Sequence, residues 1–363
     1  MGFCPPLFFS LPWNLLRAAI CLVLLAFLTF AQSPTSAQLF NEALAAQQRG
    51  ELDSAIRGYE RLLSVNPALL PARINLAQAL LQTGHIDEAV ANFRIALRAD
   101  PGSFQSALLL GNALFSAGKY GEASALLQPL ERSHADDLDL AFILGEALIR
   151  QGKQADGLKR VVRVASSRND ADAWMLAGLT QLKLNDYASA RDSLETALRI
   201  NPAEPGAYTL SGMAKLASGD EEGAKAAYRK AIELDGNDFD ANLRLGTLLY
   251  RQGDPEAAEP FLTHALQINP SSIPARYEMA QLETNAHRDD AAAKDLETII
   301  RIVPNMLQAH IRLAAVYYRM HRPEDGKRER QIVDDLLAHP KAQAQDPSLA
   351  LDISAVSEQA PSR

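Results

Sequence analysis

The chain has 363 residues, of which 47% are hydrophobic and 22% are charged, and its formal net charge is −8. This composition excludes a wholly disordered chain and a polytopic membrane protein. The sequence contains no basic block, so we expect no nucleic acid partner. Both cysteines, Cys4 and Cys21, lie within the first 21 residues. The chain after Cys21 has no cysteine and can therefore form neither a disulfide nor a thiolate metal site.

Residues 1–37 are predicted to be an export signal. An uncharged apolar run, Ala18–Phe30, follows Arg17 and is shorter than the roughly 20 residues that span a bilayer. The small residues Thr35-Ser36-Ala37 favour cleavage after the alanine. An uncleaved membrane anchor is the alternative, because apolar residues from Leu11 onward could lengthen the run. In both cases we expect the rest of the chain outside the cytoplasm. A cleaved chain would be periplasmic or secreted, and an uncleaved chain would be anchored to the inner membrane.

Small residues then recur at a fixed interval of 34 residues, with one step of 33. The first series is Ala43, Ala77, Gly111, Gly145, Gly178, Gly212, Gly246, Ala280 and Ala314. A second series, twelve positions later, is Ala55, Ala89, Ala123, Gly157, Ala190, Ala224, Ala258, Ala292 and Gly326. Between them lie the turn residues Gly50, Gly84, Gly118, Gly152, Asn185, Gly219, Gly253, His287 and His321. A period of this length indicates a repeat architecture.

Each unit is predicted to be a helical hairpin. Leu76, Ala77 and Leu80 form the apolar stripe of one first helix, and a turn glycine can take the left-handed conformation that ends it. The next helix begins with Asp87 and Glu88, whose charges suit a helix N-terminus. The two small-residue series are expected to mark where the paired helices cross closely.

These recurring positions resemble the tetratricopeptide-repeat (TPR) family. The resemblance implies an all-α fold, a right-handed α-solenoid of about nine hairpins over residues 38–340. The units are expected near 36–69, 70–103, 104–137, 138–170, 171–204, 205–238, 239–272, 273–306 and 307–340. The family's aromatic residue at repeat position 4 is clear only at Trp174 and Tyr208, and Pro129 and Pro260 fall inside second helices, which they are expected to bend. Residues 341–363 are polar and are predicted to be a disordered tail.

No catalytic motif stands out. The spacing from Gly111 to Gly118-Lys119 leaves six residues between the glycines, whereas a phosphate-binding loop needs four. The seven histidines lack the H-E-x-x-H spacing of a zinc site, and no cysteine nucleophile follows the predicted cleavage point. We therefore expect no enzymatic activity, no cofactor and no metal.

The resemblance implies a groove that binds peptide or helical segments of other proteins. We thus expect an exported, non-catalytic protein–protein interaction scaffold; a structural subunit of an envelope secretion, pilus or polysaccharide-export assembly is the alternative. Membrane contact is expected only through an uncleaved N-terminal segment. The family's concave positions, counted from the small residue, predict a partner-binding groove of Phe142, Met175, Leu179, Met213, Arg244, Tyr250, Arg251, Tyr277, Arg312 and Arg319.

This groove is expected to be apolar at its centre and basic and aromatic toward its C-terminal end. The matching ligand is an apolar anchor with an acidic flank or a C-terminal carboxylate, since arginine pairs well with carboxylates. Burial of the apolar groove residues between neighbouring first helices is the alternative. The arginines are not expected in the core.

Overall fold

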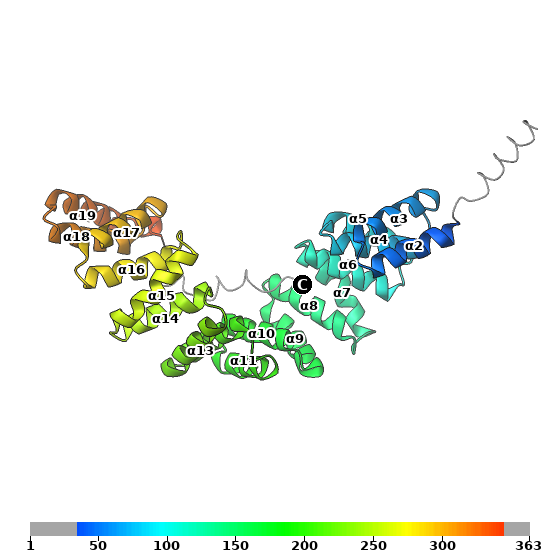
Figure 1. Ribbon diagram of the computed structural model, residues 1–363, viewed down its shortest axis with the longest axis horizontal. Coiled ribbons are helices and arrows are strands. Elements are labelled where there is room, and N and C mark those ends of the chain that lie inside the picture. Colours follow the sequence, from blue (N-terminus) through cyan, green and yellow to red (C-terminus); the bar gives the residue numbers. More distant parts are fainter. Residues whose placement is uncertain (1–34, 345–363) are drawn as a thin grey trace, which may run out of the picture. The chain divides into compact units, whose positions relative to one another are not determined.

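The computed structural model describes residues 35–344 (Figure 1). Nearly all of the predicted export signal and most of the predicted tail lie outside the described residues. Residues 35–344 contain α-helices and two short 3₁₀ segments but no strand. They divide into two compact units, and the boundary in the sequence lies between His134 and Ala135.

The described part of the first unit contains three hairpins. Its elements are α2 (Ser36–Gln48), α3 (Leu52–Val65), α4 (Leu70–Gln82), α5 (Ile86–Ala99), α6 (Phe104–Ser116), α7 (Tyr120–Leu127) and η1 (Gln128–Arg132). Each helix packs on the next along the chain, and the first helices α2 and α4 also touch.

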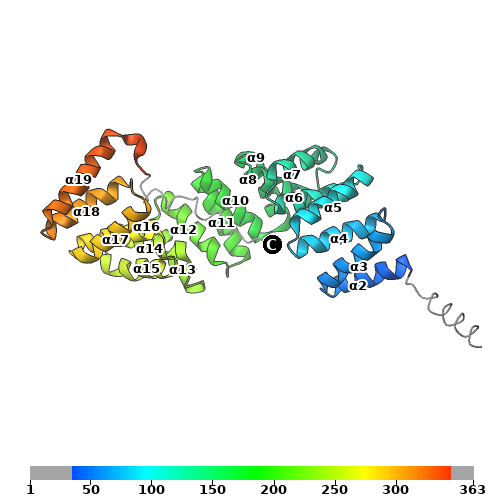
Figure 2. The same cartoon turned by 90° about the horizontal axis from the view of Figure 1, so that it is seen from above.

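The described part of the second unit, which ends at residue 344, contains six hairpins. Its elements are α8 (Leu138–Arg150), α9 (Gln154–Arg168), α10 (Ala171–Lys183), α11 (Tyr187–Ile200), α12 (Pro205–Ala217), α13 (Glu221–Leu234), α14 (Phe239–Arg251), α15 (Pro255–Ile268), α16 (Ile273–Asn285), α17 (Asp289–Ile302), α18 (Leu307–Arg319), α19 (Pro323–Ala338) and η2 (Pro340–Ala342). Consecutive helices again pack side by side (Figure 2), and first helices contact one another at α10–α12, α14–α16 and α16–α18. The predicted all-α solenoid of helical hairpins is confirmed.

The turn series explains where each first helix ends. All nine of its residues have a positive φ, between 56° and 85°. Six of them are glycine, for which this conformation carries no steric penalty. Asn185, His287 and His321 adopt it as well, so the hairpin geometry is kept where the sequence departs from glycine.

The two small-residue series lie where paired helices touch. All the alanines in both series are buried. In the hairpin of α12 and α13, a Cβ at Gly212 would lie 2.4 Å from the ring of Tyr228. In the hairpin of α8 and α9 both positions are glycine, and a Cβ at Gly157 would lie 2.4 Å from the backbone oxygen of Gly145. The lack of a side chain therefore sets the helix separation.

The two prolines expected to bend second helices behave differently. Pro260 lies inside α15, as expected. Pro129 instead lies in η1, after α7 has already ended at Leu127. Because proline cannot donate the backbone hydrogen bond of a continuing α-helix, the second helix there ends in a 3₁₀ turn, and the expectation of a bent α-helix at Pro129 is wrong.

A cationic side chain takes the fourth position of three units, where the family usually has an aromatic residue. Arg276 donates from Nη1 to the carboxylate of Asp295 at 2.6 Å and from Nη2 to the carbonyl of Pro270 at 2.6 Å. Arg276 thereby links α17, the second helix of its unit, to the loop between α15 and α16. Equivalent bonds are made by Arg73 to Asn92 and Pro67, and by His310 to Glu329 and Pro304.

His310 makes this contact pH-dependent. Its side chain is 2% exposed, and its Nδ1 and Nε2 lie 2.6 Å and 2.8 Å from the Glu329 carboxylate and the Pro304 carbonyl. Both partners accept hydrogen bonds, so the doubly protonated ring satisfies them best. Burial lowers the pKa of His310, but the hydrogen bonds to Glu329 and Pro304 outweigh it, and the pKa is raised overall.

We expect the hairpin of α18 and α19 to lose stability as pH rises. A raised folded-state pKa gives stabilisation that is complete below the unfolded pKa of about 6.5 and is lost as pH rises through the folded-state value. Amide hydrogen exchange of α19 between pH 6 and 9, corrected for intrinsic rates, measures this. His310→Arg, which copies Arg276, should remove the dependence; equal slopes in the two proteins would contradict it.

Candidate functional site

Three first helices of the second unit, α14, α16 and α18, line a pocket of about 230 Å³. We call it the basic pocket. Its residues are Tyr250, Arg251, Tyr277, Glu278, Gln281, Gln308 and Arg312. The helix α16 contacts both α14 and α18. Side chains on the same face of these three helices therefore lie together and line the basic pocket.

Arg312 is held in a fixed orientation. Its Nε donates to the hydroxyl of Tyr277 at 3.1 Å, and its Nη2 donates to Oε1 of Gln281 at 2.7 Å. The guanidinium also lies 5.5 Å from the centre of the Tyr277 ring, within the range of a cation–π interaction. A guanidinium has five N–H donors, so these two bonds leave it able to pair with a carboxylate.

Arg251 and Glu278 complete the charge of the basic pocket. The Arg251 side chain is 58% exposed, and its guanidinium lies 3.9 Å from the Glu278 carboxylate, which is 2% exposed. Gln281 donates to the other carboxylate oxygen at 3.3 Å. Burial raises the pKa of Tyr250, Arg312 lowers it, and Glu278 raises it further. The lining thus contains two guanidiniums and one carboxylate, and the basic pocket carries a net positive charge.

Four predicted groove residues therefore lie together: Tyr250, Arg251, Tyr277 and Arg312 line the basic pocket. Arg319 does not line it. Its guanidinium donates to the Thr284 carbonyl at 3.1 Å and pairs with the carboxylate of Asp289.

Arg244 overturns the expectation that the arginines stay out of the core. It is 8% exposed on α14. Its charge acts on Tyr228 and Asp240, and it opposes the effect of burial on the pKa of both groups. Burial raises the pKa of Tyr228 to about 12, although Arg244 opposes the rise. A tyrosine from the preceding second helix and an aspartate one turn away provide Arg244 with a polar environment inside the stack.

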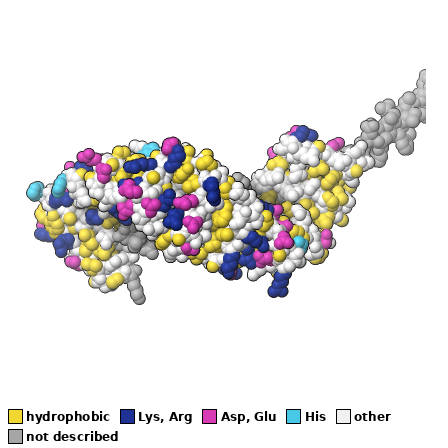
Figure 3. All heavy atoms as spheres, turned by 90° about the horizontal axis from the view of Figure 1, so that it is seen from below, with side chains coloured by type: hydrophobic (Ala, Val, Ile, Leu, Met, Phe, Trp, Pro, Cys, Tyr) yellow, Lys and Arg dark blue, Asp and Glu magenta, His cyan; other side chains and the backbone are white. Residues whose placement is uncertain are grey.

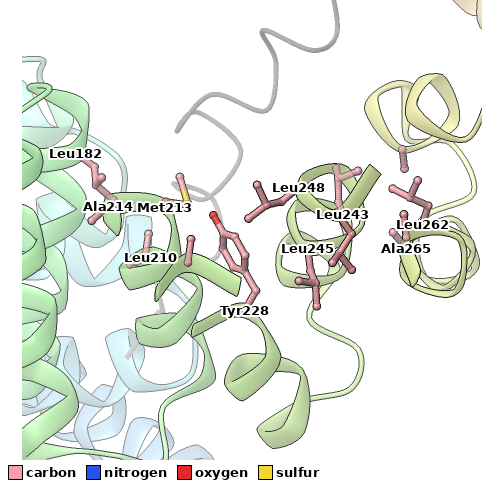
Figure 4. Packing of buried hydrophobic residues seen from close by; sticks show 14 of the residues in the cluster. Leu182, Leu210, Met213, Ala214, Tyr228, Leu243, Leu245, Leu248, Leu262 and Ala265 are labelled. Carbon is pink, nitrogen blue, oxygen red and sulfur yellow. The ribbon is translucent and has the colours of Figure 1, made fainter. Parts of the chain in front are cut away.

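The predicted apolar centre of the groove is mostly packed. Leu179 and Met213 are 8% and 5% exposed and belong to the largest buried cluster of the second unit. Figure 4 shows Met213 near Leu210 and the Tyr228 ring. The end of the ring that carries the hydroxyl is directed toward Met213 and Leu248. Their burial favours the packing alternative.

Phe142 and Met175 are half-buried against neighbouring clusters. Charged groups accompany them on α8 and α10. Burial raises the pKa of Glu146, although Arg150 opposes the rise, while burial and then Arg150 lower the pKa of Lys183. The face around Phe142 and Met175 is thus mixed rather than apolar.

Three residues of the basic pocket are not among those predicted from the sequence: Glu278, Gln281 and Gln308. They occupy the sixth, ninth and second positions of their units, counted from Ala280 and Ala314. The same positional count would have found them. It missed them because only basic and aromatic side chains were selected at this end of the groove.

A larger pocket, of about 450 Å³, lies in the first unit and is lined by Gly50, Glu51, Leu52, Asp53, Ser54, Arg57 and Thr83. Its charged side chains are two carboxylates and one guanidinium, so it lacks the excess of arginine that marks the basic pocket. Figure 3 shows acidic and basic side chains interspersed over the face that it presents. Among residues 35–344, no group of three or more His, Cys, Asp or Glu side chains could hold a metal ion. Within the same range, no helix has the length and apolar character to cross a membrane.

Comparison with known proteins identifies the repeats. Three family models, each described as a tetratricopeptide repeat, match most of the described chain. The first matches residues 40–104, 74–123 and 108–165, the second residues 215–282 and 249–301, and the third residues 171–204. No curated protein matches the chain in sequence.

Solved structures resemble the fold. A tetratricopeptide repeat protein from Parabacteroides merdae is 14% identical, with 68% of this chain and 98% of that chain covered and a TM-score of 0.51. The C-terminal part of a TPR repeat-containing protein from Cytophaga hutchinsonii is 16% identical, with 66% and 99% covered and a TM-score of 0.53. The TPR protein YrrB, described as having an unusual peptide-binding site, is 20% identical, with 50% and 93% covered and a TM-score of 0.44.

Proposed function

The chain belongs to the tetratricopeptide-repeat family, and on that basis we propose that it is a non-catalytic protein-interaction scaffold. The basic pocket binds a partner segment that combines a carboxylate with a neighbouring apolar side chain. One observation carries the proposal: the orientation of Arg312, fixed by Tyr277 and Gln281 beside the exposed Arg251. A pre-organised guanidinium loses little freedom when it pairs with a carboxylate.

The strongest candidate for acid–base chemistry is better explained by packing. The pKa of Glu283 is raised to about 7 by burial first and by the nearby carboxylate of Asp295 second. Glu283 does not line the basic pocket, whereas a general acid or base needs a site where a substrate can reach it. Its shifted pKa therefore gives no reason to propose a reaction.

We place the scaffold outside the cytoplasm. This proposal rests on the apolar run and the small-residue cleavage sequence within residues 1–37, nearly all of which lie outside the described residues. A role as a fixed subunit of an envelope assembly would use the same basic pocket.

Charge reversal tests the basic pocket. In the full chain, Arg251→Glu combined with Arg312→Glu should weaken binding of acid-flanked peptides by at least about tenfold, or 1.4 kcal/mol, and should remove the salt sensitivity of binding. Fluorescence anisotropy with peptides selected by display on the wild-type chain measures the affinity.

Two further variants control for fold and for net charge. Arg229→Glu with Arg301→Glu makes the same charge change at exposed positions of α13 and α17 and should leave binding intact. Arg251→Glu alone changes an exposed side chain, so weakened binding there cannot be attributed to misfolding. Unchanged affinity in the double pocket variant would show that peptides bind elsewhere.

A further inference from the structure

We propose that residues 346–358 of this chain bind the basic pocket in cis, as an internal ligand that partner segments must displace. The inference rests on the proposed function for the chemistry of the basic pocket. It adds an occupant whose identity is given by the sequence and by the place where the described chain leaves the fold.

The described chain leaves the fold beside α18, the helix that carries Gln308 and Arg312 of the basic pocket. After α19 and η2 it turns back, and Gln343 donates from its side chain to the Leu336 carbonyl at 2.9 Å. The backbone N–H of Ala344 then donates to the carbonyl of Asn305 at 3.0 Å. Asn305 lies just before α18 and three residues before Gln308, which lines the basic pocket. The last described residue, Ala344, therefore lies next to the N-terminal end of α18.

The sequence that follows has the composition the basic pocket favours. It carries carboxylates at regular intervals, with apolar side chains between them and no lysine or arginine before Arg363. The acidic residues are Asp346, Asp352 and Glu358, and the apolar ones are Leu349, Leu351, Ile353 and Val356. Acidic groups beside apolar anchors complement Arg251 and Arg312 next to Tyr250 and Tyr277.

The reach of the segment is sufficient. An extended chain spans about 3.3 Å per residue, so residues 345–352 cover up to about 26 Å. Gln308 and Arg312 are one helical turn apart, about 6 Å along α18. Because a short tether gives an effective concentration of the order of millimolar, even a ligand that is weak when added in trans occupies the basic pocket in cis.

Competition in the full chain tests the proposal. The probe is a fluorescently labelled synthetic peptide with the sequence of residues 345–360, measured by anisotropy. Three serine substitutions remove large apolar side chains from residues 346–358: Leu349→Ser, Leu351→Ser and Ile353→Ser. We call this variant the anchor-cleared chain. The matched control variant carries Ser348→Ala, Ser354→Ala and Ser357→Ala.

We expect the anchor-cleared chain to bind the probe at least about tenfold more tightly than the wild-type and control chains. Adding Arg251→Glu and Arg312→Glu to the anchor-cleared chain should abolish that gain. Hydrogen exchange of residues 345–360 in the wild-type chain should show protection that does not depend on protein concentration and that is lost in the pocket variant.

Four results would overturn the proposal. Equal probe affinity in the wild-type and anchor-cleared chains would exclude cis occupancy, while a loss in the pocket variant would still support the proposed function. If the probe did not bind while the acid-flanked peptides selected by display still did, residues 346–358 would not be a ligand of the basic pocket. Protection that rises with protein concentration would assign the segment to a second copy of the chain. Failure of every peptide to bind would reject the proposed function as well.

Discussion

Replacing Met213 by glutamate should lower the free energy of unfolding by about 3 kcal/mol or more. Met213 is 5% exposed on α12 and packs in the cluster that contains Leu210, Tyr228 and Leu248 (Figure 4). A glutamate there must either keep an unpaired charge in an apolar setting or take up a proton, and both cost free energy. Urea unfolding followed by circular dichroism measures the loss.

Met213→Leu is the matched control, because it keeps the volume and apolar character and should cost less than about 1.5 kcal/mol. Met213 lies at a position that the family resemblance assigns to the groove, so the pair of variants separates two roles. If Met213→Glu changed stability by only about 0.5 kcal/mol, the side chain would be accessible and available to a ligand.

Gly157→Leu should be destabilising by about 3 kcal/mol, at the upper end of the range for overpacking. A Cβ at Gly157 would lie 2.4 Å from the Gly145 oxygen and 3.0 Å from the Ile149 nitrogen. Both are backbone atoms, so the clash cannot be relieved by a side-chain rotation, and α8 must move away from α9. Thermal unfolding measures the change.

Ala224→Gly is the control for this prediction. It occupies the equivalent position of α13, where the chain already accepts a buried methyl group, and it should cost about 1 to 2 kcal/mol from lost helix propensity and lost burial. If Gly157→Leu were tolerated equally well, the close crossing of α8 and α9 would not be set by the glycine pair.

The fold could be predicted because the repeat positions obey local rules. A positive φ at Gly84 or Gly253 is allowed by the sterics of glycine itself. The 34-residue recurrence that includes Ala89 and Ala258 marks the close crossings of paired helices, where both alanines are buried. The 3₁₀ turn at Pro129 could not be predicted in the same way, because the sequence does not say whether a proline bends a helix or ends it.

The site could be predicted only in part. Counting positions placed Tyr250, Arg251, Tyr277 and Arg312 on one face, and the structure brings them into one pocket. Counting could not give the burial of the groove side chains, because their exposure depends on the side chains of neighbouring units. Arg244 shares its repeat position with Glu278 and Arg312, yet it is buried, and its charge acts on Tyr228 and Asp240 in the interior.

The central claim is that Arg251 and Arg312 select the partner by its charge. A charge swap tests it most directly, with the affinities of one acid-flanked peptide and its lysine-flanked counterpart measured on both chains. The anchor-cleared chain should prefer the acid-flanked peptide, and the same chain with Arg251→Glu and Arg312→Glu should prefer the lysine-flanked one. The same preference in both chains would contradict binding at the basic pocket.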